Sequence, residues 1–106
     1  SKPIDKQVLL DSIKKLGIEV SQALVMVVDD DVQIRELVKR ILEPEGVNLI
    51  EAKNGQEALD QLDQSPDLII LDLDMPVMNG FEFIQNISVN ETSKDIPIVV
   101  FSGTSC

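Results

Sequence analysis

The chain has 106 residues and a net charge of −10, from 19 acidic and 9 basic residues. A chain of this length forms one domain, and its negative charge argues against nucleic acid or an anionic membrane as a partner. It has no histidine and a single cysteine, Cys106, which excludes a disulfide framework, a zinc cluster and a histidine general base. The sequence also has no signal peptide and no apolar run of the roughly 20 residues that cross a bilayer, so we predict a reduced, cytoplasmic domain.

The first predicted element is a helix near the N-terminus. Asp5 can cap its start, Leu9, Ile13 and Leu16 form an apolar stripe, and Gly17 is a helix stop. The segment IEVSQA then leads to the first strand and could span about 20 Å if extended.

The rest of the chain alternates between two hydrophobic periods. Four short, mostly apolar runs are typical of buried strands in a parallel sheet: 25–28, 47–50, 68–71 and 98–101. Three segments between them have helical spacing: 34–41, 58–62 and 81–87. Turns are predicted at EPEG, KNG and QSPD. This alternation predicts an α/β fold with right-handed βαβ units and a doubly wound parallel sheet.

Carboxylates gather where two of these strands end. Asp29 and Asp30 follow the first strand, Asp72 ends the third, and Asp74 comes two residues later. Ligands bind beyond the carboxyl ends of strands in such sheets, so a sheet with the first and third strands adjacent brings these charges together. Like charges repel unless a cation neutralises them. Mg²⁺ suits a small group of aspartates because it prefers oxygen ligands.

The residues alone leave three interpretations of these aspartates open. Asp31 immediately precedes a helix, where a carboxylate acts as a cap, so its expected role is structural. For Asp29, Asp30 and Asp72 the alternatives are the same structural role at strand ends and turns, a metal site alone, or a metal site in which Asp72 is a nucleophile toward phosphorus. Met75 and Met78 are expected to be packing residues.

Four separated motifs occur in order along residues 24–103: VVDDD, EAKNGQEAL, PDLIILDLDMPVMNGFEF and IPIVVFSG. With them the chain resembles the receiver domain of two-component response regulators. The resemblance implies a flavodoxin-like fold and a phosphoacceptor module of a phosphorelay, whose partner is a histidine kinase or a phosphotransfer protein carrying a phosphohistidine. Such a module is not an ordinary enzyme, because it promotes only its own phosphorylation and dephosphorylation.

The resemblance assigns the central roles by position. Asp72 matches the phosphoacceptor. Asp29 and Asp30 match the acidic pair that holds Mg²⁺, and Asp74 would contribute its backbone carbonyl to the same ion.

Residues around the phosphoryl group are assigned in the same way. Ser102 matches the hydroxyl residue that bonds a phosphoryl oxygen, and Lys2 resembles the lysine that pairs with the phosphoryl group. The side chains of Asp74 and Thr104 would lie where they gate water attack on the phosphoaspartate and so set its lifetime.

The two ends of the chain depart from the pattern of a receiver. The first residues, SKPIDKQVLLDSIKKLG, resemble the Lys-Pro and fifth helix that end a receiver. At its other end the chain stops before the segment that would form the family's fourth helix and most of its fifth strand. We expect residues 1–20 to be the tail of a preceding receiver, as in a tandem array or hybrid histidine kinase, or an element that docks in place of the fifth helix. Residues 21–106 are then a receiver truncated after the fourth strand, whose exposed edge favours a homodimer or strand exchange.

Two other functions stay open. LDLD places Asp72 and Asp74 two residues apart after a strand, as in haloacid-dehalogenase-like phosphatases, although those carry the pair on their first strand. The other alternative is a non-signalling interaction fragment. Turnover of a generic phosphate ester identifies the phosphatase, because a receiver turns over almost none.

Overall fold

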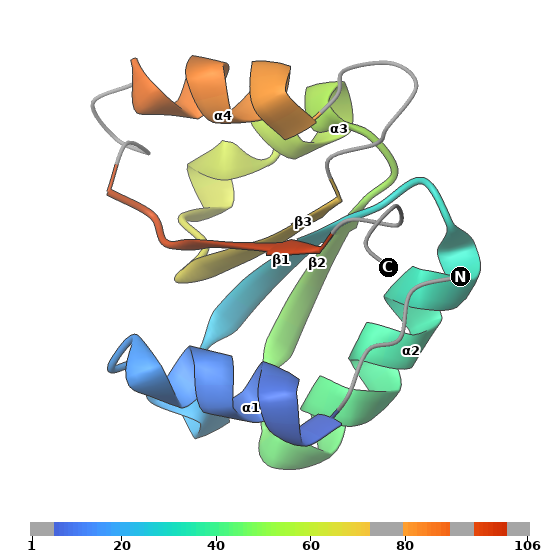
Figure 1. Ribbon diagram of the computed structural model, residues 1–106, viewed down its shortest axis with the longest axis vertical. Helices are drawn as coiled ribbons and strands as arrows, with labels where there is room; N and C mark the ends of the chain where they lie inside the picture. The colour runs from blue at the N-terminus through green and yellow to red at the C-terminus, as the bar shows by residue number, and fades with distance from the viewer. Residues whose placement is uncertain (1–5, 73–79, 90–94, 102–106) are drawn as a thin grey trace.

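The computed structural model of the chain describes residues 6–72, 80–89 and 95–101. A four-stranded parallel sheet with the order β2-β1-β3-β4 lies between two layers of helices, α1 and α2 on one face and α3 and α4 on the other (Figure 1). The strands are β1 (Leu24–Val28), β2 (Asn48–Ala52), β3 (Leu68–Asp72) and β4 (Ile98–Phe101). The helices are α1 (Lys6–Lys15), α2 (Val32–Leu42), α3 (Gly55–Asp60) and α4 (Gly80–Ser88). The predicted α/β fold with a doubly wound sheet is confirmed.

The position of β1 and β3 in the centre of the sheet explains why their sequences are almost continuously apolar. Side chains alternate across a strand, so Val25 and Val27 enter the core beneath α1 and α2, whereas Met26 and Val28 enter the core beneath α3 and α4. All five residues of β3 are buried. Helices therefore cover both faces of these strands, as the unbroken apolar runs predicted.

Strand β2 differs from the prediction in both position and burial. Its predicted range was 47–50, but the strand runs from Asn48 to Ala52, and Asn48 and Glu51 are exposed. It pairs with β1 alone in the described sheet, so its environment is less apolar than that of the central strands. Val47 is buried but lies before the strand, where its N–H donates to the carbonyl of Leu42, at the end of α2.

Helix α1 is packed onto the sheet. Leu9, Leu10 and Ile13 are at most 5% exposed and belong to the same core as the inward side chains of β1, β3 and α2. The prediction that Leu16 continues the apolar stripe was wrong: it is 46% exposed, because the helix has ended at Lys15 and the chain turns there. The predicted stop at Gly17 is confirmed by its left-handed φ of +77°.

Two short segments set the path of the chain between elements. The linker after α1 contains a 3₁₀ turn, Val20–Gln22, rather than running fully extended. A second 3₁₀ turn, Glu43–Glu45, ends at Gly46 with φ +90°, which confirms the EPEG stop. None of the helices in the described ranges is long and apolar enough to cross a membrane.

Candidate functional site

The site is built at the carboxyl end of the two central strands. β1 and β3 are parallel neighbours, and Val28 pairs with Leu71 in their register. The next residue on each strand is an aspartate, so Asp29 and Asp72 leave the sheet side by side. The predicted adjacency of the first and third strands is confirmed, and it is what brings the two carboxylates together.

Three carboxylates converge at this edge. One oxygen from each of Asp29, Asp30 and Asp72 lies within 4.8 Å of the other two. Asp29 and Asp72 are 3% and 4% exposed, whereas Asp30 is exposed. Carboxylates are rarely buried unless they are paired or bind a metal, and an all-oxygen donor set of this size fits a hard divalent cation. The cluster can therefore hold a metal ion on its solvent side.

The backbone around Asp29 is held from several directions. Its N–H donates to the carbonyl of Ala52 at 3.0 Å, and its Oδ1 accepts from the N–H of Asp31 at 2.9 Å. Asp31 in turn accepts the N–H of Gln33 at 2.8 Å and caps α2, which confirms its predicted structural role. The loop between β1 and α2 is thus fixed by its own aspartates.

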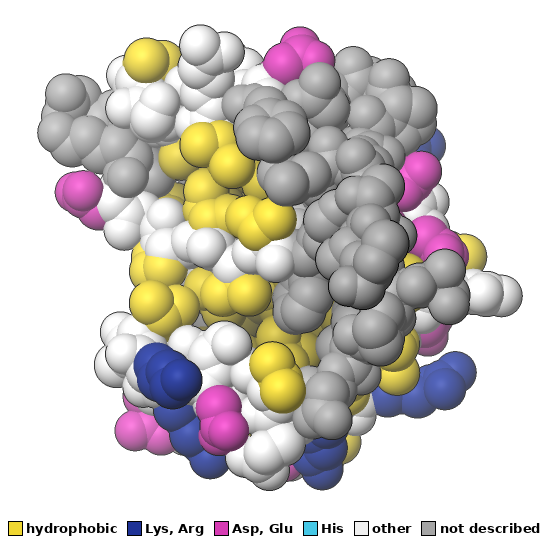
Figure 2. Space-filling view, viewed as in Figure 1, with side chains coloured by type: hydrophobic (Ala, Val, Ile, Leu, Met, Phe, Trp, Pro, Cys, Tyr) yellow, Lys and Arg dark blue, Asp and Glu magenta, His cyan; other side chains and the backbone are white. Residues whose placement is uncertain are grey.

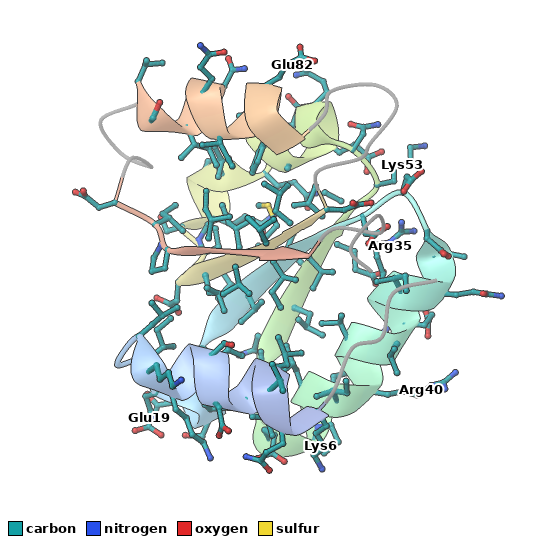
Figure 3. All side chains as sticks on the ribbon, in the orientation of Figure 1. Lys6, Glu19, Arg35, Arg40, Lys53 and Glu82 are labelled. Atoms are coloured by element: carbon teal, nitrogen blue, oxygen red, sulfur yellow. The ribbon has the colours of Figure 1, made fainter. Side chains whose placement is uncertain are left out.

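A further contact at this loop comes from Arg35, which was not predicted from the sequence. Its Nη1 donates to the carbonyl of Asp29, and its Nε lies 3.1 Å from Oε1 of Glu51 on β2. In Figure 3, Arg35 lies between α2 and the ends of the strands. The sequence does contain a signal that could have identified Arg35: a positively charged residue four positions after the last of three consecutive aspartates.

The second helix that begins at this edge is also capped. Asn54 accepts the N–H of Glu57 through Oδ1 at 2.8 Å, and Glu57 accepts the N–H of Lys53 at 3.0 Å. The arrangement resembles a capping box, except that Glu57 accepts from the residue before the cap rather than from Asn54 itself. The KNG segment is therefore a bend that leads into α3, which confirms its prediction as a turn.

Several predicted site residues lie outside the described ranges. These are Lys2, Asp74, Ser102 and Thr104, as well as the two methionines expected to pack, Met75 and Met78. Their roles remain predictions. The structure brings together the three aspartates that the sequence selected as metal ligands.

Comparison with known proteins identifies the family. The family model described as response regulator receiver domain matches residues 25–106. The chain belongs to this family. A curated relative of this receiver is the sensor histidine kinase CheAY of Helicobacter pylori, 34% identical over 86 residues, which are 78% of this chain and 11% of CheAY. This receiver thus spans only a small part of that relative's length.

Solved receiver structures share its fold. The chemotaxis protein CheY4 of Vibrio cholerae matches with a TM-score of 0.74 and 35% identity, covering 80% of this chain and 72% of CheY4. The Mn²⁺-bound form of the response regulator Rcp1 matches with a TM-score of 0.70 and 29% identity, covering 79% of this chain and 68% of Rcp1. The flavodoxin-like receiver fold predicted from the sequence motifs is confirmed.

Proposed function

We propose that this receiver is a phosphoacceptor module in two-component phosphorelay signalling. Asp72 takes a phosphoryl group from a phosphohistidine of a histidine kinase or phosphotransfer protein, with Mg²⁺ as cofactor. The observation that carries the proposal is the convergence of Asp29, Asp30 and Asp72 within 4.8 Å at the strand ends of a receiver fold.

Asp72 is the best candidate for the nucleophile because it ends a strand that is paired on both sides. It ends β3, which is paired with β1 on one side and with β4 on the other, where Asp72 is opposite Phe101. In the transfer, an oxygen of Asp72 forms a bond to phosphorus while the bond from phosphorus to the histidine nitrogen breaks, and the electron pair stays on that nitrogen. Such a reaction depends on positioning and on charge neutralisation. It needs no general base from the protein, which suits a chain without histidine.

The cation has a clear set of candidate ligands. Asp29, Asp30 and Asp72 would hold it, and we propose that the backbone carbonyl of Asp74 completes the protein's share. When bound, Mg²⁺ neutralises the repulsion between the carboxylates and the incoming phosphoryl oxygens. Because Asp30 is exposed, water could complete the coordination of a cation held by these residues, and Mg²⁺ in proteins usually keeps several waters. The Mn²⁺-bound structure of the related Rcp1 supports this part of the proposal.

The remaining roles follow the family pattern. We propose that Ser102 and Lys2 contact the phosphoryl group, and that the side chains of Asp74 and Thr104 set the lifetime of the phosphoaspartate. The packing of α1 beside α2 on one face of the sheet supports the idea that this opening helix takes the place of a fifth helix. Under this proposal Lys2, four residues before α1, is supplied to the site by that helix.

The test is intact mass after incubation with phosphoramidate and Mg²⁺. Phosphoramidate presents a phosphorus–nitrogen bond, as a phosphohistidine does. We expect one phosphoryl adduct on the wild type, none on Asp72→Asn, and none when the cation is chelated. Asp63→Asn is the matched control, because Asp63 is an exposed aspartate in the 3₁₀ turn before β3. An undiminished, Mg²⁺-dependent adduct on Asp72→Asn would contradict the proposal, and rapid turnover of p-nitrophenyl phosphate would favour the phosphatase instead.

A further inference from the structure

Arg35 lies at an unusual place for a cation. It is the fourth residue of α2, in the half of the helix that begins at Val32 after the cap Asp31. The N-terminal end of a helix carries partial positive charge and favours anions, whereas Lys39 and Arg40 occupy the last turn, which favours cations. Something other than the helix dipole must therefore hold the guanidinium of Arg35 in place.

Two acceptors from different strand ends hold it. The Nη1 group lies 2.5 Å from the backbone carbonyl of Asp29, after β1, and Nε lies 3.1 Å from Oε1 of Glu51, on β2. The Arg35 side chain is 15% exposed and that of Glu51 is 35% exposed. A planar guanidinium with fixed donor directions suits two acceptors at once, so Arg35 connects α2, β1 and β2 at the edge of the sheet where the carboxylates lie.

The carbonyl that Arg35 binds belongs to the peptide between two of the proposed metal ligands, Asp29 and Asp30. The N–H on the other side of Asp29 is bound to the carbonyl of Ala52. The peptide groups on both sides of the Asp29 Cα are thus anchored, one by Ala52 and the other by Arg35. The direction of the peptide between Asp29 and Asp30 decides where the Asp30 carboxylate can point.

We propose that Arg35 is a positioning residue for the divalent-cation site, and that Glu51 orients Arg35. The inference rests on the proposed function, because it assumes that the three aspartates bind a cation. Arg35 does not contact the ion; it fixes the peptide that carries two of its ligands. Outer contacts of this kind commonly change metal affinity by about 10- to 100-fold when they are removed.

The direction of the change in metal affinity distinguishes a positioning role of Arg35 from a purely electrostatic one. Arg35 carries a positive charge next to an acidic cluster, so removing that charge alone should make cations bind more tightly. Removing a positioning contact should make them bind more weakly. Arg35→Gln therefore gives opposite results under the two explanations.

The experiment is calorimetric titration of the metal-free receiver with Mn²⁺, for the wild type and Arg35→Gln. We expect Arg35→Gln to bind at least about tenfold more weakly. Arg40→Gln is the matched control: it makes the same charge change on an exposed residue in the last turn of the same helix, and we expect wild-type affinity. Glu51→Gln should weaken binding in the wild-type background and have little effect when combined with Arg35→Gln, because Glu51 acts through Arg35.

The outcomes distinguish this inference from the proposed function. Failure of the wild type to bind Mn²⁺ overturns the proposed function and this inference with it. Wild-type or tighter binding by Arg35→Gln overturns this inference alone. Urea unfolding checks that each variant is folded. If Arg35→Gln is unfolded, Arg35→Lys is the deciding variant, because it keeps the charge but lacks the forked guanidinium group. Weaker Mn²⁺ binding by Arg35→Lys supports the positioning role. Wild-type affinity, or an unfolded variant, overturns that role.

Discussion

The two buried carboxylates of the site should destabilise the metal-free protein. Asp29 and Asp72 are 3% and 4% exposed and offer oxygens within 4.8 Å of each other. With an effective dielectric constant of about 20, two unit charges at that separation repel by about 3.5 kcal/mol. Asp72→Asn removes this repulsion but also alters the other contacts of Asp72. We therefore expect the free energy of unfolding without metal to rise by about 1–3 kcal/mol.

Urea unfolding at neutral pH, with and without Mg²⁺, measures this effect. The cation should stabilise the wild type by about 4.1 kcal/mol when its concentration is one thousand times the dissociation constant. Asp72→Asn loses a ligand and should gain much less, so the order of stability of the two proteins should reverse when Mg²⁺ is added. Asp63→Asn, at an exposed position, should change stability by no more than about 0.5 kcal/mol. An Asp72→Asn variant that is less stable than the wild type without metal would show that repulsion between Asp29 and Asp72 does not dominate the stability of the metal-free protein.

Three further predictions concern the scaffold, and urea unfolding measures each. Leu9→Ala removes a fully buried side chain of α1 and should lower the free energy of unfolding by about 2–5 kcal/mol. Its control is Val8→Ala, at a residue 58% exposed, which should lower it by under about 0.5 kcal/mol. Equal losses would mean that α1 does not pack on the sheet in solution. Gly46→Ala should destabilise the protein more than Gly17→Ala. Both glycines have a positive φ, but only at Gly46 would a Cβ meet a backbone oxygen, that of Ser21, at 3.0 Å. The reverse order of stability would contradict this geometry. Asp31→Ala should lower the free energy of unfolding by about 0.5–2 kcal/mol, because the cap on α2 is lost. An unchanged urea midpoint would exclude a capping role for Asp31.

The central features of the fold could be predicted because they depend on local pattern. The apolar runs of β1 and β3 and the aspartates directly after Val28 and Leu71 are visible in the sequence. Parallel βαβ connections then place the carboxyl ends of these strands at the same edge. The convergence of Asp29 and Asp72 therefore follows from strand adjacency and register alone.

The features that were not predicted depend on tertiary contacts. The sequence predicts that β2 starts at Val47, because burial outside a strand looks the same in a sequence as burial within one. The spacing also places Leu16 in the buried stripe of the first helix, since nothing in it shows that the helix has already ended at Lys15. The position of Arg35 shortly after the three aspartates could have indicated its contact with that loop. Its contact with Glu51, sixteen residues further along the chain, could not be predicted, because a contact between two elements cannot be read from the period of either one.

Asp72 is the proposed site of phosphorylation. The most direct measurement is borohydride reduction of the receiver after incubation with phosphoramidate and Mg²⁺, followed by peptide mass spectrometry, because reduction converts a phosphorylated aspartate into homoserine. We expect homoserine at position 72, and at no other aspartate, only when both the phosphodonor and Mg²⁺ are present. Homoserine at another aspartate, with position 72 unchanged in a folded sample, would contradict it.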